Sequence, residues 1–221
     1  MPLHSAPHTV RAVVFDLDGT LIDSTNAIVQ SFLHTFDAIG EPRPAREAII
    51  RSIGYTLEQQ FALFTRHDPG DCARIYRSHY AEICCPMTSL MPGAREALDA
   101  LNSIGLRLGF ATSKRRLYAE MILEHLRVLH YFDVRIGPDD VTRPKPAPDA
   151  MLRALELFAL APGEVLFIGD SHFDVECARA AGVACLCVTT GYETRAELEE
   201  LRPAGIYDSL REVADHVLFT R

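Results

Sequence analysis

The chain contains 221 residues, of which 48% are hydrophobic and 24% charged, so it can bury a sizeable core and is neither disordered nor fibrous. Its length suits one large domain, or a core with a modest second lobe. The 30 acidic and 22 basic residues give a net charge of −8 with His neutral, which argues against nucleic-acid binding. No apolar run approaches the roughly 18 residues that cross a bilayer, so we expect no membrane segment.

The first residues and the cysteines favour a cytoplasmic protein. The first ten residues lack the basic start, apolar centre and small-residue cleavage site of a secretory signal, and we interpret them as a frayed lead-in. The six cysteines form no CxxC pair and no zinc-like spacing, so we expect reduced thiols. Cys177, Cys185 and Cys187 lie in apolar stretches and are expected in the core.

Short apolar runs alternate with helical patterns through most of the chain. Five runs, each followed by a polar or glycine-containing turn, predict buried strands at residues 11–16, 106–112, 132–137, 165–170 and 183–189. Helical patterns that end near Gly or Pro cover residues 94–103, 115–126, 146–160 and 173–181. This alternation predicts an α/β fold with a Rossmann-like, doubly wound parallel sheet.

One stretch breaks the alternation. Helix-like patterns at residues 25–39, 46–53, 57–65 and 71–85 follow one another with no convincing strand between them. We therefore expect an all-helical insert at residues 24–85, after the first strand, and an α/β core formed by residues 10–23 and 86–221. Ser24 is expected to cap the first helix of the insert.

Acidic residues follow two of the predicted strands. In open parallel sheets, ligands bind beyond the carboxyl ends of the strands. Asp16 and Asp18 end the first strand and point the same way, two residues apart, so their carboxylates repel each other unless a cation or a shared proton is present. Asp170 and Asp174 follow the fourth strand and add two more carboxylates.

Anion-binding groups lie between these acids. Thr112, Ser113 and Lys114 follow the second strand and offer hydroxyls and amides at a helix start, a natural anion site. Lys145 lies among prolines at another helix start and is one of only two lysines in the chain. Four carboxylates could hold Mg²⁺, which prefers oxygen ligands, while these groups take the oxygens of a phosphate. One acid of the first pair would then be the nucleophile and the other the proton donor.

The motifs DLDGT, a strand ending in Thr, PKPAPD and GDSHFD occur in this order from residue 16 to residue 174. Because it contains these four motifs in this order, the chain resembles the phosphatases of the haloacid dehalogenase superfamily, in particular the phosphoglycolate phosphatase-like branch. The resemblance covers the chain after its first ten residues. It implies that Asp16 forms an aspartyl-phosphate, that Asp18 protonates the leaving oxygen and later activates water, and that Thr112 and Lys145 clamp the phosphoryl group.

The resemblance also implies a metal and a cap. Asp170, the carboxylate of Asp16 and the backbone carbonyl of Asp18 would bind Mg²⁺, with Asp174 in support. Ser113 would bind phosphate through its backbone amide. The helical insert matches the family's cap, which closes over the site and selects the substrate.

The cap insert contains candidate substrate-binding residues, namely Arg43, Arg46, Arg51 and Tyr55. An arginine directed at the site would favour a small phosphate ester with a second negative charge, phosphoglycolate being the first to try. Lys114 could reach the phosphate or lie in solvent. We interpret Asp23 and His172 as structural residues beside the site.

The same residues bear on several alternative functions. The dehalogenases of the superfamily lack an acid at the Asp18 position, and its phosphonatases use a cap lysine, whereas this insert contains no lysine. A sugar-phosphate phosphomutase or a pyrophosphatase remains open, and a non-enzymatic phospho-receiver domain is disfavoured because such domains have no helical insert. The expected partner is a small phosphorylated metabolite, and the oligomeric state, monomer or homodimer, is left open.

Overall fold

A computed structural model describes residues 10–220 and shows one central sheet of six parallel strands. In spatial order the strands are β5 (Phe132–Ile136), β4 (Arg107–Ala111), β1 (Ala12–Phe15), β6 (Val165–Gly169), β7 (Ala184–Val188) and β8 (Gly205–Tyr207). The chain first adds strands on one side of β1 and then on the other. The carboxyl ends of β1, β4 and β6 therefore meet at the switch point of the sheet.

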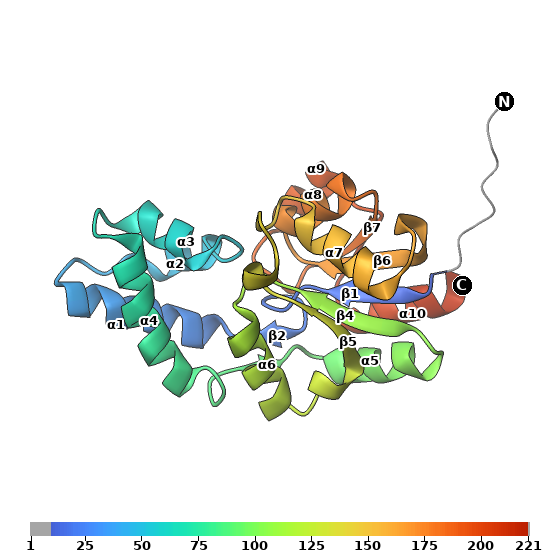
Figure 1. Cartoon of the computed structure of the whole chain (residues 1–221), viewed down its shortest axis with the longest axis horizontal. Helices are drawn as coiled ribbons and strands as arrows, with labels where there is room; N and C mark the ends of the chain where they lie inside the picture. The colour runs from blue at the N-terminus through green and yellow to red at the C-terminus, as the bar shows by residue number, and fades with distance from the viewer. Residues whose placement is uncertain (1–9, 221) are drawn as a thin grey trace.

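Helices cover both faces of the sheet (Figure 1). One face carries α5 (Ala94–Ser103), α6 (Arg116–His125) and α10 (Leu210–Thr220), and the other carries α7 (Asp149–Phe158), α8 (His172–Ala180) and α9 (Arg195–Leu201). Strand β1 is buried throughout because its side chains alternate between the two layers. Val13 and Phe15 belong to the first core cluster, and Ala12 and Val14 to the second.

The insert forms a helical cap beside the carboxyl edge of the sheet (Figure 1). Its helices are α1 (Thr25–Ile39), α2 (Arg46–Arg51), α3 (Leu57–Phe64) and α4 (Pro69–Ile83). An aromatic cluster holds α1, α3 and α4 together: Phe32 stacks on Phe61 with 4.6 Å between ring centroids, and Tyr76 meets Phe32 edge-on at 5.4 Å. A two-stranded antiparallel ribbon, β2 (Ile22–Asp23) with β3 (Ser89–Leu90), joins cap and core.

The predicted fold class is confirmed, with differences at particular elements. The helix expected from residue 146 begins only at Asp149, because Pro146 and Pro148 keep the residues before them out of the helical conformation. Ser24 occupies the N-cap position of α1, as expected, but its hydroxyl caps no backbone N–H of the helix and instead donates to the side chain of Asp18. The carboxylate of Asp23 instead accepts a hydrogen bond from the backbone N–H at the start of α1.

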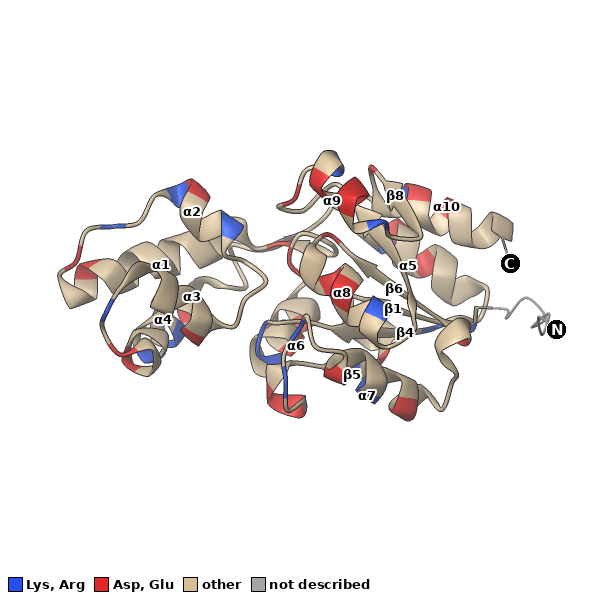
Figure 2. Ribbon diagram, turned by 90° about the horizontal axis from the view of Figure 1, so that it is seen from above, with Lys and Arg blue, Asp and Glu red and all other residues tan. Residues whose placement is uncertain are grey.

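The expectations about the first residues, membrane segments and cysteines can be compared with the described residues. Apart from Val10, the expected lead-in lies outside the described residues. No helix within residues 10–220 is long and apolar enough to cross a membrane. Cys177, Cys185 and Cys187 are buried, as expected. Acidic and basic positions are interspersed over both lobes (Figure 2).

Candidate active site

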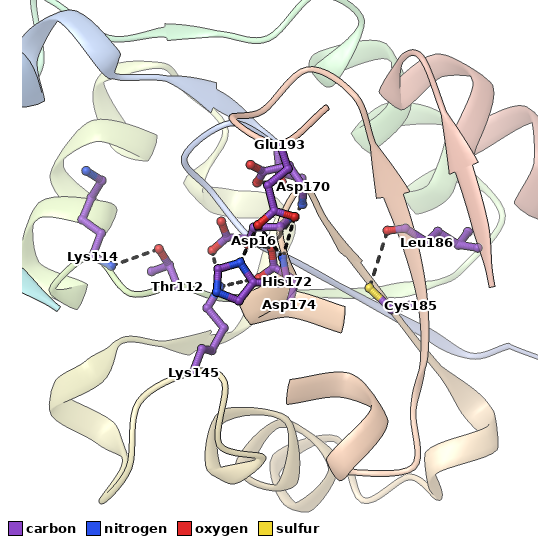
Figure 3. Close-up of polar contacts among 12 residues, drawn as sticks. Asp16, Thr112, Lys114, Lys145, Asp170, His172, Asp174, Cys185, Leu186 and Glu193 are labelled. Atoms are coloured by element: carbon purple, nitrogen blue, oxygen red, sulfur yellow. Dashed lines mark hydrogen bonds and ion pairs between the residues drawn. The ribbon is translucent and has the colours of Figure 1, made fainter. Parts of the chain in front are cut away.

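Three buried carboxylates meet at the carboxyl edge of the sheet (Figure 3). Asp16 follows β1, Asp170 follows β6, and Asp174 lies in the first turn of α8. One oxygen of each lies within 4.8 Å of the others, which makes them the group of three metal-ligand side chains found among residues 10–220. The sheet topology thus brings Asp16 beside Asp170 and Asp174, which stand more than 150 positions later in the sequence.

Lys145 reaches into this cluster from the loop before α7 (Figure 3). Its Nζ donates to Oδ1 of Asp16 at 2.7 Å and to Oδ1 of Asp174 at 2.6 Å. Burial raises the pKa of Asp16 to about 7, and the attraction of Lys145 opposes this only in part. Burial alone would lower the pKa of Lys145, but the two carboxylates outweigh it and raise that pKa. Lys145 is therefore a fixed positive charge at the site.

Asp174 is bound through both of its oxygens. Lys145 occupies Oδ1, while Oδ2 accepts hydrogen bonds from the backbone N–H groups of Asp170 and Ser171 and from the Ser171 hydroxyl. The backbone of Gly169 passes so close that a Cβ there would lie 2.4 Å from Asp174. Donors of the protein thus occupy both oxygens of Asp174, and the side chain holds Lys145 and the loop before α8 in place.

Asp170 is held by Thr20 of the DLDGT motif, for which no role was expected, and by two residues after β7 that lie outside the motifs. Its Oδ1 accepts a hydrogen bond from the Thr20 hydroxyl at 2.8 Å, and the backbone N–H of Tyr192 lies 3.4 Å from Oδ2. Gly191 packs against the same carboxylate. Burial raises the pKa of Asp170 well above its usual value, and Asp174 and Asp16 add to this effect. The loop after β7 carries Gly191 and Tyr192, so the strand-end rule applied to residues 183–189 would have found them.

The Asp18 carboxylate lines the same crevice as Asp16 and Asp170 but does not belong to the three-carboxylate cluster. Its Oδ1 accepts a hydrogen bond from the Ser24 hydroxyl and lies 3.1 Å from Nζ of Lys114. Nζ of Lys114 also donates to the hydroxyl of Tyr80, on the cap helix α4, at 2.7 Å. The metal contact expected of Asp18 involves its backbone carbonyl, so that contact does not require the carboxylate.

The expected phosphate-binding groups border the same crevice. Thr112, Ser113 and Lys145 line it together with Asp16 and Asp170. The Thr112 hydroxyl accepts a hydrogen bond from the backbone N–H of Lys114 at 3.1 Å. The Ser113 hydroxyl is buried and meets no hydrogen-bond partner within residues 10–220. The crevice thus presents donors opposite the carboxylates.

A larger cavity of about 390 Å³ lies between the cap and the core. Asp18 and Ser113 line both this cavity and the crevice, so the two spaces adjoin. The cationic residues of the cavity wall are Arg77 from α4, and Lys114 and Arg115 from the loop before α6. The cavity can therefore receive the part of a substrate that extends from its phosphate.

Of the four expected cap residues, the structure brings Tyr55 to this cavity, where its ring meets Phe173 of α8 edge-on at 4.7 Å. Arg43 binds the carboxylate of Asp37 at 2.6 and 2.7 Å on the exposed surface. Arg46 and Arg51 are likewise held elsewhere, by side chains of α1 and α9 respectively. None of the three arginines lines the cavity.

His172 stands beside the site, at the start of α8. Its Nδ1 and its backbone N–H both contact the carboxylate of Glu193. The hydrogen bond to Glu193 raises the pKa of the His172 imidazole, although partial burial opposes this. The pair joins α8 to the loop after β7.

The chemistry of the donor set fits a divalent cation. Two lysines, Lys114 and Lys145, face four carboxylates, those of Asp16, Asp18, Asp170 and Asp174. When all four are ionised, two negative charges are left uncompensated in a largely buried space, which is costly and agrees with the raised pKa values of Asp16 and Asp170. Oxygen ligands of this kind suit Mg²⁺.

Comparison with known proteins decides the family. A family model of the haloacid dehalogenase-like hydrolases matches residues 13–188, which is most of the chain. The chain belongs to the haloacid dehalogenase-like hydrolases. It is therefore an enzyme, and the resemblance inferred from its four motifs is confirmed.

Among similar members of this hydrolase family, phosphoglycolate phosphatase of Escherichia coli is 31% identical over 229 residues, covering 92% of this chain and 91% of that protein. A pyrophosphatase of Bacillus mycoides is also 31% identical and covers 92% and 95%. A solved haloacid dehalogenase-like hydrolase from Streptococcus pneumoniae superposes with a TM-score of 0.86 at 32% identity, covering 94% and 98%. A structure described as a predicted phosphoglycolate phosphatase from Haemophilus somnus gives the same TM-score at 27% identity, covering 96% and 99%.

Proposed function

We propose that this hydrolase is a Mg²⁺-dependent phosphatase that cleaves a small phosphomonoester through an aspartyl-phosphate on Asp16. The observation that carries the proposal is the setting of Asp16. It is buried at the switch point of the sheet, with Oδ1 held by Lys145 and with Thr112 and Ser113 on the same crevice. A carboxylate fixed in this way, facing donors that suit phosphoryl oxygens, is placed for nucleophilic attack.

Two chemical steps follow from this arrangement. In the first, an oxygen of Asp16 bonds to phosphorus, the bond to the leaving oxygen breaks, and the leaving oxygen takes a proton from Asp18. In the second, Asp18 accepts a proton from a water that attacks phosphorus, and the bond to Asp16 breaks. Lys145 and the groups of Thr112 and Ser113 bind the remaining phosphoryl oxygens in both steps. Phosphate and the free carboxylate of Asp16 are the products.

The residues that would hold Mg²⁺ are Asp16, Asp170 and the backbone carbonyl of Asp18, with Asp174 orienting them. When bound, the ion supplies positive charge that lets the anionic phosphate approach an anionic nucleophile. The protein residues provide the rest: Asp174 fixes Lys145, and Thr20 fixes the orientation of Asp170.

The cavity supports a substrate with a second negative charge. Arg77 and Arg115 lie in its wall, where they pair with Glu58 and Asp139 of the same wall. A guanidinium can bind a carboxylate or a second phosphate through two hydrogen bonds, so each arginine could exchange its partner for an anionic group of the substrate. These residues replace Arg43, Arg46 and Arg51 as candidates for that task. Relatives named phosphoglycolate phosphatase make phosphoglycolate the first substrate to test.

A pyrophosphatase is the second candidate. The Bacillus mycoides relative that carries this name is as similar to the chain as the phosphoglycolate phosphatases are. Pyrophosphate also has a second anionic group for the cavity arginines. A phosphomutase would use the same core residues and is distinguished by its product.

The test measures phosphate release from phosphoglycolate, pyrophosphate and a sugar phosphate, with Mg²⁺ and after chelation by EDTA, and assays isomerised sugar phosphate alongside. We expect Mg²⁺-dependent release that Asp16→Asn abolishes, because the amide has the same shape but cannot attack phosphorus. Asp215→Asn, the same change at an exposed site on α10, should keep activity. Near-normal release by Asp16→Asn, or full activity after exhaustive chelation, would overturn the proposal.

A further inference from the structure

The second lysine of the chain, Lys114, is buried between the cap and the acid Asp18. Only 7% of its side chain is exposed. Its Nζ lies 3.1 Å from Oδ1 of Asp18 and donates to the Tyr80 hydroxyl at 2.7 Å. The ammonium also lies 4.8 Å from the centroid of the Tyr80 ring. An ammonium removed from water in this way needs such partners to remain charged.

The two contacts on Asp18 fall on one oxygen. Oδ1 accepts from the Ser24 hydroxyl and lies against Lys114. A proton carried by Asp18 therefore belongs on Oδ2, because Oδ1 already faces a hydroxyl donor and an ammonium that has only donors. The lysine thus determines which oxygen of the acid can give up a proton.

The partner that holds Lys114 on its other side comes from the cap. Tyr80 belongs to α4, is 1% exposed, and stacks on Tyr76 of the same helix with 5.3 Å between centroids. Tyr118 of the core helix α6 meets Tyr80 edge-on at 5.4 Å. The hydroxyl and ring of Tyr80 therefore reach Lys114 only while α4 lies over the core.

We propose that Lys114 is a positioning residue for Asp18 and that Tyr80 makes this positioning depend on the docked cap. The inference rests on the proposed phosphatase function. Lys114 holds Oδ1 of Asp18, so that Oδ2 carries the proton to the leaving oxygen. Tyr80 fixes the ammonium from the cap side, so the acid is aligned when the cavity is covered and loses its alignment when the cap moves away.

The test compares two aryl esters of the same shape, phenyl phosphate and p-nitrophenyl phosphate. The phenolate is the more basic leaving group and needs the proton of Asp18, whereas p-nitrophenolate leaves without it. Both esters present the same phosphoryl group and no second anion, so a change in substrate binding affects them alike. The quantity compared is kcat/KM, which covers the steps up to formation of the aspartyl-phosphate.

Lys114→Met keeps the length of the side chain and removes its charge. We expect kcat/KM for phenyl phosphate to fall by about ten- to a hundredfold, and that for p-nitrophenyl phosphate to fall by less than about threefold. Tyr80→Phe keeps the ring and removes the hydroxyl, and should show the same selectivity with a smaller loss. Because Tyr80 acts through Lys114, the double variant should be no worse than Lys114→Met alone.

Tyr118→Phe is the matched control. It removes another tyrosine hydroxyl from the contact of cap and core, which donates to the backbone carbonyl of Arg77 at 3.2 Å and does not touch Asp18. Any loss in this variant should be equal for the two esters. Thermal unfolding of each variant verifies folding, and Tyr80→Phe carries the test if Lys114→Met does not fold.

Two outcomes would overturn the inference. Equal losses for both esters in Lys114→Met and Tyr80→Phe would give Lys114 a structural or phosphate-binding role. Additive losses in the double variant would separate Tyr80 from Lys114. A wild-type protein that hydrolyses neither ester nor any other phosphate would instead refute the proposed function itself.

Discussion

Asp174→Asn should destabilise the fold far more than its small change in shape implies. The side chain is fully buried and binds four donors: Nζ of Lys145 at 2.6 Å, two backbone N–H groups, at Asp170 and Ser171, at 3.1 Å each, and the Ser171 hydroxyl at 2.7 Å. An amide offers one acceptor oxygen and one NH₂ group. Whichever way it turns, the NH₂ group faces Lys145 or the two backbone donors.

The magnitude follows from the broken ion pair. Removing one partner of a buried pair costs about 3–5 kcal/mol, and the relief of repulsion with Asp16 and Asp170 offsets part of this cost. For a chain of this length each kcal/mol lowers Tm by roughly 2–4 °C, so we expect a fall of up to roughly 20 °C. The loss of the negative charge also frees Lys145 from one of its two anchors, so activity should fall with stability.

Urea denaturation and thermal unfolding measure the effect, with Asp215→Asn as the control. That residue lies on the exposed side of α10, where the same substitution should change stability by less than about 0.5 kcal/mol. A loss below about 1 kcal/mol for Asp174→Asn would refute the view that its hydrogen bonds hold the site together.

Two further changes test other contacts. Gly191→Ala would place a Cβ 1.8 Å from Oδ2 of Asp170, so activity should fall by about a hundredfold through displacement of that carboxylate. Gly40→Ala meets no neighbouring atom, and although its φ of 72° makes alanine there cost some stability, it should leave activity intact. An equal effect of the two substitutions would contradict this reading. The pKa of His172, raised by Glu193, should lie above its ordinary value of about 6.5 in an NMR titration. The protonated pair then stabilises the fold in acid, and this contribution is lost as pH rises through the folded-state pKa; an unchanged titration in Glu193→Gln would exclude the pair as the cause.

Several parts of the predicted site follow strands, whereas Lys145 and Asp174 were predicted at helix starts and from the motifs. Asp16, Thr112 and Asp170 could be placed because parallel strands bring their carboxyl ends to one edge. The orientation of the Asp18 carboxylate could not, since it depends on Ser24 and Lys114, which come from separate segments that meet only in the folded chain.

The orientation of the charged side chains of the cap could not be predicted from the sequence either. Its helices follow from apolar periodicity, but periodicity does not say which charged face turns toward the core. Arg43 is held by Asp37, six residues before it, and such local pairing competes with any role at a site. Arg77 reaches the cavity because α4 packs against α1 and α3. This packing depends on contacts between helices and cannot be predicted from the sequence of α4 alone. The ribbon β2–β3 is too short to give a periodic signal.

That ribbon has a consequence for how enzymes of this architecture could diversify. Ile22 pairs with Leu90 and Asp23 with Ser89, so the chain leaves the core and returns to it side by side. The whole cap is therefore an insertion between the two strands of this ribbon. Its helices could be lengthened, rearranged or exchanged without moving the two points of attachment, and the strands that carry Asp16 and Asp170 would keep their register. Substrate range can thus change by replacement of a module while the hydrolytic centre is inherited intact.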